Sequence, residues 1–185
     1  NLKILIYKIY ISVMTVKFLN KKISFDNLNN LILFTSLDNN ISGLEKSLLR
    51  KHKKSILETL ALNKKNFKDF LTFNLSPKLR VTLIRIENQN SSIKNEKLGA
   101  NFFDYINRNS IYQNSFVSEN LEFLIKLNKN FFNEFIFGIK VKCYQFNIYK
   151  THKKKNIFFM NVNNIKISSY NNDRFNSLVE GINFT

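Results

Sequence analysis

Short segments in which apolar and polar residues alternate place the strongest limit on how this chain can fold. Residues 79–83 (Leu-Arg-Val-Thr-Leu) alternate strictly, and the pattern returns at residues 139–143 and 165–167. Alternation predicts strands with one buried face, which are typical of antiparallel sheets, whereas strands of parallel sheets are continuously apolar. An apolar stretch at residues 28–37 predicts one more strand.

Apolar residues at helical spacing predict four helices between and around these strands. They are expected within residues 1–25, from the capping-box pair Ser42 and Glu45 onwards, near residues 102–106, and over residues 175–182. Residues 87–100 are polar and predict a loop insertion. The order of elements predicts an α+β fold, in which an antiparallel β-sheet has its helices packed on one side, within a single domain spanning residues 1–185.

The chain carries a large excess of cations. Its 185 residues include 29 Lys and Arg against 13 Asp and Glu, a formal net charge of +16. Such a charge disfavours a compact state unless a polyanion neutralises it, so RNA or DNA is the expected partner. We expect no membrane partner, because the cations are not confined to one amphipathic helix. They gather at Arg50, Lys51, Lys53 and Lys54, at Lys64 and Lys65, at Lys78 and Arg80, and at Lys153, Lys154 and Lys155.

The polar residues indicate no enzyme. His52 and His152 lie inside basic clusters, where neighbouring cations repel metal ions. Cys143 is the single cysteine, which excludes a disulfide framework and multi-cysteine zinc sites, and its alternating segment predicts a buried structural thiol. The sequence contains no phosphate-binding glycine loop, nucleophile elbow or zinc-binding helix motif. We therefore predict no catalytic residue, no metal site and no cofactor.

Residues 64–83 resemble the signature of the large-subunit ribosomal protein five family. The resemblance begins with Lys-Lys-Asn-Phe-Lys-Asp-Phe at residues 64–70 and continues through Pro77 to Arg-Val-Thr-Leu at residues 80–83. Asp69 stands where the family has a glycine. Further matches follow in the same order along the chain, at residues 28–40, 102–108, 137–140, 165–169 and 173–184.

The resemblance implies a structural constituent of the mitochondrial large ribosomal subunit, placed in the central protuberance. There the chain would bind rRNA (5S rRNA if present, otherwise large-subunit rRNA) and contact peptidyl-site tRNA and neighbouring ribosomal proteins, including the small-subunit head. Residues Lys64, Lys65, Asn66 and Lys68 would form a tRNA-facing loop, and Thr82 would touch rRNA from its strand. Phe67 and Phe70 are expected to anchor that loop on the sheet.

Composition also favours an organelle. The chain is rich in Asn, Lys, Ile and Phe, whose codons are AT-rich, as in organellar genomes. We therefore expect the mitochondrial matrix as its location. Two alternatives stay open at this point: another organelle-encoded ribosomal protein, of the small subunit, and an organellar nuclease or intron-splicing factor.

Overall fold

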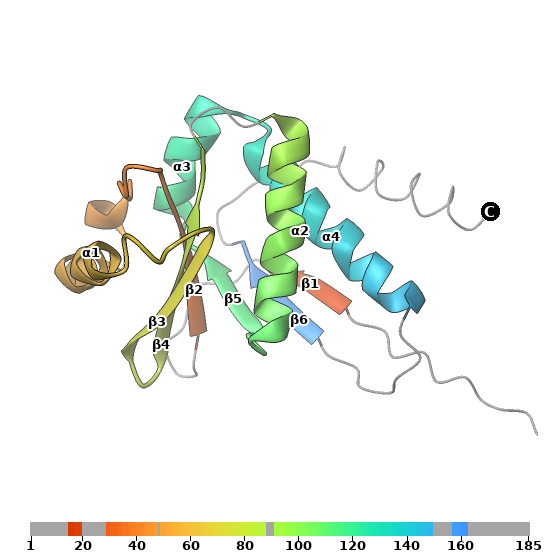
Figure 1. Ribbon diagram of the computed structural model, residues 1–185, viewed down its shortest axis with the longest axis horizontal. Coiled ribbons are helices and arrows are strands. Elements are labelled where there is room, and N and C mark those ends of the chain that lie inside the picture. Colours follow the sequence, from red (N-terminus) through yellow and green to blue (C-terminus); the bar gives the residue numbers. More distant parts are fainter. Residues whose placement is uncertain (1–14, 20–28, 48, 88–90, 150–156, 163–185) are drawn as a thin grey trace, which may run out of the picture.

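The structure, a computed structural model, describes residues 15–19, 29–47, 49–87, 91–149 and 157–162. Its centre is a six-stranded sheet with the strand order β1-β6-β5-β2-β4-β3 (Figure 1). The strands are β1 (Thr15–Leu19), β2 (Asn29–Thr35), β3 (Phe70–Ser76), β4 (Leu79–Arg85), β5 (Gln113–Phe116) and β6 (Ile157–Asn161). The helices are η1 (Leu44–Lys46), η2 (Arg50–His52), α1 (Lys53–Leu62), α2 (Ser92–Arg108), α3 (Ser118–Leu127) and α4 (Phe131–Tyr149).

The sheet is mixed and mostly parallel, so the prediction of an antiparallel sheet is wrong. Only the hairpin of β3 and β4 pairs antiparallel; the other four pairings in the described sheet are parallel. The predicted strands at residues 28–37 and 79–83 are confirmed as β2 and β4. The central run of β2, Leu31 to Phe34, is fully apolar and at most 2% exposed, which is the pattern of a parallel strand with both faces covered.

Helices cover both faces of the sheet, so the prediction of helices on one side is also wrong. In Figure 1, α1 lies on one side of the sheet and α2 with α4 on the other. Successive residues of β2 alternate between the two cores. Ile32 and Phe34 belong to the cluster under α2 and α4, whereas Leu31 and Leu33 belong to the cluster on the α1 side.

Two segments that were predicted from local pattern are helical instead. Residues 87–100 are not a loop insertion, because α2 begins at Ser92 and the side chain of Ser91 caps it. In the first part of this helix Asn95 and Gly99 are buried and Leu98 is half-buried, while Ile93, Lys94 and Lys97 are exposed. Residues 139–143 are not a strand but part of α4. That helix is buried around most of its circumference, so apolar residues occur at both helical and alternating spacings.

The amino-terminal part of the chain also differs from prediction. The described residues of segment 1–25 form strand β1 rather than a helix. Ser42 and Glu45 do not form a capping box, because Gly43, in the left-handed region at φ 80°, precedes the short helix η1 and α1 begins only at Lys53. Residues 165–167 and 175–182 lie outside the described residues, as do His152, Lys153, Lys154 and Lys155.

Candidate functional site

A pocket lies at the carboxyl ends of β2 and β4. After β2 the chain turns to the face covered by α1, and after β4 it turns to the face covered by α2. Connections that leave adjacent parallel strands in opposite directions open a crevice between them, where ligands bind in many α/β proteins. The pocket fills this place and has a volume of about 430 Å³, within the usual range for small-molecule sites.

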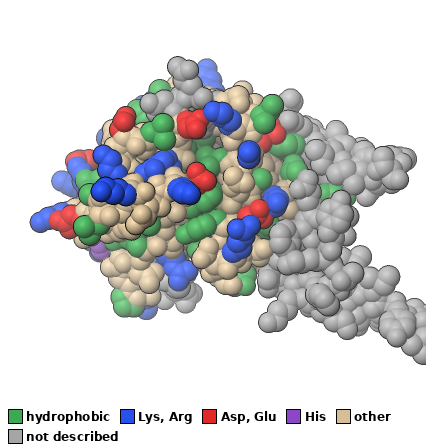
Figure 2. Space-filling view, viewed as in Figure 1, with side chains coloured by type: hydrophobic (Ala, Val, Ile, Leu, Met, Phe, Trp, Pro, Cys, Tyr) green, Lys and Arg blue, Asp and Glu red, His purple; other side chains and the backbone are tan. Residues whose placement is uncertain are grey.

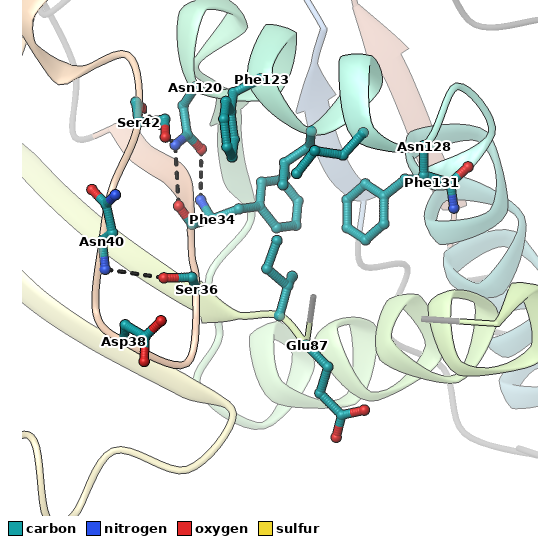
Figure 3. Close-up of a pocket in the computed structure, with 13 residues that line it drawn as sticks. Phe34, Ser36, Asp38, Asn40, Ser42, Glu87, Asn120, Phe123, Asn128 and Phe131 are labelled. Carbon is teal, nitrogen blue, oxygen red and sulfur yellow. Dashed lines mark hydrogen bonds between the residues drawn. The ribbon is translucent and has the colours of Figure 1, made fainter. Parts of the chain in front are cut away.

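Aromatic and aliphatic residues are six of the thirteen described lining residues and form the inner part of the pocket and part of its opening (Figure 3). The rings of Phe34 and Phe131 meet edge to face, with centroids 5.3 Å apart. Phe123 and Leu127 of α3 line the opening and are 47% and 66% exposed. The apolar lining residues are Phe34, Ile86, Phe123, Leu124, Leu127 and Phe131.

The loop after β2 supplies polar groups to the pocket. It contributes Ser36, Asp38, Asn40 and Ser42. The amide of Ser36 donates to the carbonyl of Asn40 at 3.1 Å, and the amide of Asn40 donates to Oγ of Ser36 at 3.2 Å. These bonds hold the loop in a fixed turn and leave the exposed carboxylate of Asp38 at its tip.

Asn120 of α3 holds this loop and the end of β2 together. Its Oδ1 accepts from the amide of Phe34 at 2.6 Å, and its Nδ2 donates to the carbonyls of Phe34 and Ser42 at 3.1 and 2.9 Å (Figure 3). The side chain is 2% exposed, so its amide satisfies three buried backbone groups. Asn120 was not predicted as a functional residue. Its position beside Leu121, on the buried side of an amphipathic helix, is the sequence signal that could have pointed to it.

The pocket is acidic although the chain is strongly basic. Asp38 and Glu87 are among its described lining residues, and no lysine or arginine is. Glu87 already accepts from Nζ of Lys94 at 2.6 Å. Asp38 makes no ion pair within the described part of the chain. The arrangement therefore favours a neutral or cationic ligand over an anion.

The loop for which the sequence analysis predicted a tRNA contact lies between α1 and β3. Lys64, Lys65, Asn66 and Lys68 are all exposed there, while Phe67 is 2% exposed. The guanidinium of Arg85 lies 4.1 Å from the centroid of the Phe67 ring and also donates to the Phe67 carbonyl. The expected anchoring role of Phe67 is confirmed. Phe70 also anchors the loop, since its ring stacks on Tyr105 at 5.0 Å.

The other predicted RNA-binding cations are spread over the molecule. Arg50, Lys51, Lys53 and Lys54 lie where η2 leads into α1, and Figure 2 shows Lys and Arg side chains gathered at the α1 end of this face. Lys53 pairs with Glu45 and lowers the pKa of that carboxyl through a hydrogen bond and its charge. Lys78 lies in the turn of the β3–β4 hairpin, away from this group.

Arg80 and Thr82 belong to β4, where Arg80 is half-exposed and Thr82 is buried. Nε of Arg80 donates to Oδ1 of Asn74 at 3.3 Å. Thr82 is 0% exposed, lies 2.6 Å from the hydroxyl of Thr72 and donates to Oδ1 of Asn30 at 2.9 Å. The predicted contact of Thr82 with rRNA is therefore wrong for this fold, because the hydroxyl is enclosed and already bonded.

The remaining candidate groups form no reactive centre in the described ranges. Cys143 is buried as predicted, although in α4 rather than in a strand, and burial raises the pKa of its thiol to about 11. Within residues 15–162 where they are described, no three His, Cys, Asp or Glu side chains lie together as metal ligands would. Of the described helices, none is long and apolar enough to span a bilayer.

Comparison with known proteins identifies the fold but no family. No family model matches the chain, and no curated protein matches it either. A mutant of tomato leucine aminopeptidase superposes with a TM-score of 0.55 at 12% identity, covering 88% of this chain. A mutant macrodomain of Oceanobacillus iheyensis superposes with a TM-score of 0.53 at 13% identity, covering 93% of this chain and 94% of the macrodomain.

The share of each structure's own length that this chain matches differs between the two. The chain spans 35% of the aminopeptidase, about a third of its length, but nearly the whole macrodomain. At these identities the likeness concerns the fold alone. Both comparisons agree with the mixed α/β fold described above.

Proposed function

We propose that this chain is a non-catalytic domain of a larger protein related to leucine aminopeptidases. The observation that supports this proposal is the match to one part of a leucine aminopeptidase: 88% of the chain superposes on 35% of that enzyme. The chain would then correspond to one folded unit of such an enzyme, with about two thirds of the enzyme supplied by other sequence. The macrodomain match, which covers 94% of the macrodomain, leaves a separate single-domain protein as the alternative.

The described side chains support a non-catalytic role for this unit. Hydrolysis of a peptide bond needs an activated nucleophile or a metal-bound water. The thiol of Cys143 is buried and protonated at neutral pH, and His52 lies among the cations of η2 and α1. No set of potential metal ligands comes together among the described residues. In this proposal the catalytic residues belong to another domain of the enzyme.

The native protein tests this proposal directly. An antibody raised against the chain should isolate a polypeptide much larger than 21.9 kDa that releases leucine from leucyl-p-nitroanilide. The 185-residue chain, expressed by itself, should be inactive in the same assay because it lacks the catalytic part. A native polypeptide of 21.9 kDa, or a large one without activity on leucyl amides, would contradict the proposal.

RNA binding is a second candidate, favoured by the exposed cations around α1. Lys64, Lys65 and Lys68 project from an anchored loop, and Arg50 and Lys51 are exposed at the other end of α1. Such cations neutralise phosphates without reading sequence. In this proposal the chain is a constituent of the mitochondrial large ribosomal subunit in contact with rRNA and tRNA, although its sheet is mixed rather than antiparallel as the order of elements predicted.

Sedimentation separates the two candidates. If the chain is ribosomal, the native protein should move with the large subunit in a sucrose gradient and shift to the top after ribonuclease treatment. The aminopeptidase proposal instead expects a position that ribonuclease does not change. Both measurements use the same antibody and the same extract.

A further inference from the structure

We propose that the pocket at the carboxyl ends of β2 and β4 binds a small organic cation, with an apolar body and a primary ammonium group. This inference goes beyond the proposed function and does not depend on it. Its first support is position, since the pocket lies where the connections after β2 and β4 leave on opposite faces of the sheet.

The apolar body of the ligand follows from the pocket's lining. Phe34, Ile86 and Phe131 are buried at its inner end, and Phe123 and Leu127 extend the apolar surface to its mouth. The last two lie four residues apart on α3 and so share one face of the helix. A volume of about 430 Å³ accepts a phenyl ring or a branched alkyl chain together with a short polar end.

The charge of the ligand follows from the polar groups at the mouth. Asp38 presents an exposed carboxylate with two oxygen atoms, and the hydroxyl of Ser36 on the same loop offers a third, whereas the side-chain amide of Asn40 points away from Asp38 (Figure 3). An ammonium group has three donors and no acceptor, so it matches such a set of oxygens.

An anionic ligand would find few partners in the same place. Lysine and arginine are missing from the described lining of the pocket. Three amides of the loop are also occupied, because those of Ser36, Asn39 and Asn40 donate within the loop. Binding of phosphate or carboxylate groups by α/β proteins relies on cations or on free loop amides. The loop therefore discriminates by charge.

The site is formed before any ligand binds. Asn120 joins the loop to β2 through bonds of 2.6 to 3.1 Å, and Arg85 donates to Oδ1 of Asn39 at 2.8 Å from the other side. A loop that is already ordered loses little conformational entropy when a ligand arrives. This allows a small ligand to bind with measurable affinity.

Three probes that differ mainly in charge test the proposal. Binding of 2-phenylethylamine, 2-phenylethanol and 3-phenylpropionate to the full chain would be followed by calorimetry or NMR at low salt. We expect the amine to bind about two- to fivefold more tightly than the alcohol, which is the range of an exposed ion pair, and the carboxylate to bind most weakly. Equal or tighter binding of the carboxylate would overturn the proposal, as would no binding of any probe at millimolar concentration.

Two variants assign the effect to the pocket. Asp38→Asn should reduce the affinity for the amine to that for the alcohol, while the matched exposed variant Asp69→Asn should change neither. Phe123→Ala should weaken all three probes by removing apolar contact, whereas Ile93→Ala, an exposed residue outside the pocket, should not. A preference for the amine that survives Asp38→Asn would refute the assignment to this site.

Discussion

The two faces of the sheet are packed by different kinds of side chain. On the face covered by α2 and α4, the core holds eight of the chain's 19 phenylalanines, several of which meet edge to face. On the α1 face the core is aliphatic except for Phe67, and exposed lysines and arginines lie above it. The first face therefore packs aromatic side chains against two helices. The second face packs aliphatic side chains against α1, and the outer surface of that layer is positively charged.

On the first face, α2 and α4 pack closely against each other. A Cβ added at Gly99 would lie 1.9 Å from the carbonyl oxygen of Phe135, and one added at Gly138 would lie 1.9 Å from that of Glu96. The two helices thus touch through their backbones at the glycines, which is possible only where no side chain intervenes. Substitutions between α2 and α4 are therefore expected to destabilise the fold, whereas substitutions of exposed residues on the α1 face are expected to be tolerated.

The largest expected effect comes from Gly99→Ala. The new methyl group would meet a backbone carbonyl, which cannot move without separating α2 from α4. We expect a loss of about 4 kcal/mol in the free energy of unfolding, above the usual range for overpacking because the clash involves backbone. Urea denaturation measures it, with the exposed Lys97→Ala on the same helix as control. A loss no greater than the control's would show that the helices do not meet this closely.

Asn120→Ala should have the next largest effect. It removes three hydrogen bonds and leaves the amide and carbonyl of Phe34 and the carbonyl of Ser42 without that partner. We expect a loss of about 3 kcal/mol in the free energy of unfolding, because unsatisfied buried groups are costly. The exposed Asn101→Ala serves as a control. Asn120→Asp should cost at least as much as Asn120→Ala, because its carboxylate only accepts and would face the carbonyls of Phe34 and Ser42.

Alkaline pH should weaken the aromatic face through Cys143. Burial raises the pKa of its thiol from 9.0 to about 11, so the folded state favours the neutral thiol. This contribution is complete below pH 9 and is lost as the pH rises towards 11, because the unfolded chain ionises first. We expect the loss to reach about 1 to 2 kcal/mol by pH 10. Cys143→Ala should remove this part of the pH dependence; an unchanged profile would contradict the assignment.

Thr82→Val tests whether β4 serves structure or RNA binding. The hydroxyl of Thr82 links Thr72 on the neighbouring strand to Asn30 in a buried polar chain. Valine keeps the shape but removes the hydroxyl, so we expect a loss of about 1 kcal/mol in the free energy of unfolding. Affinity for RNA should not change, since the side chain is enclosed. Weaker RNA binding by a fully stable variant would reverse this interpretation.

Sequence patterns succeeded where the residues of one short segment are enough to decide its structure. β2 and β4 are strands, as the apolar run and the alternation predicted, but β4 is buried on both faces rather than on one, since Thr82 is as buried as Val81 and Leu83. Phe67 is a buried anchor between exposed lysines, as expected. In each case neighbours along the chain carry the information, so local pattern was sufficient.

Sequence patterns gave wrong predictions where contacts between residues far apart in the sequence determine the structure. Residues 139–143 alternate like a strand, but contact with α2 keeps them helical, and no local signal reveals that contact. The polar segment 87–100 hides the start of α2, because the fully buried residues described there, Asn95 and Gly99, are not large apolar residues and Leu98 is only partly buried. The pocket was missed for the same reason, since β2, β4 and α3 meet only in the folded chain. Strand pairing likewise depends on the crossovers rather than on the strands themselves.

The smallest effect on stability is expected on the charged exterior of the α1 face. Lys64 and Lys65 are exposed and project from a loop that Phe67 anchors, so replacing both with Ala should leave the free energy of unfolding unchanged. If this face binds RNA, the log–log dependence of affinity on salt should lose about 1 to 2 units of slope, because two phosphate contacts disappear. Replacing Lys97 and Lys126, exposed on α2 and α3, gives a control of equal charge. A slope that falls equally in both pairs would mean that net charge, rather than the α1 face, attracts RNA.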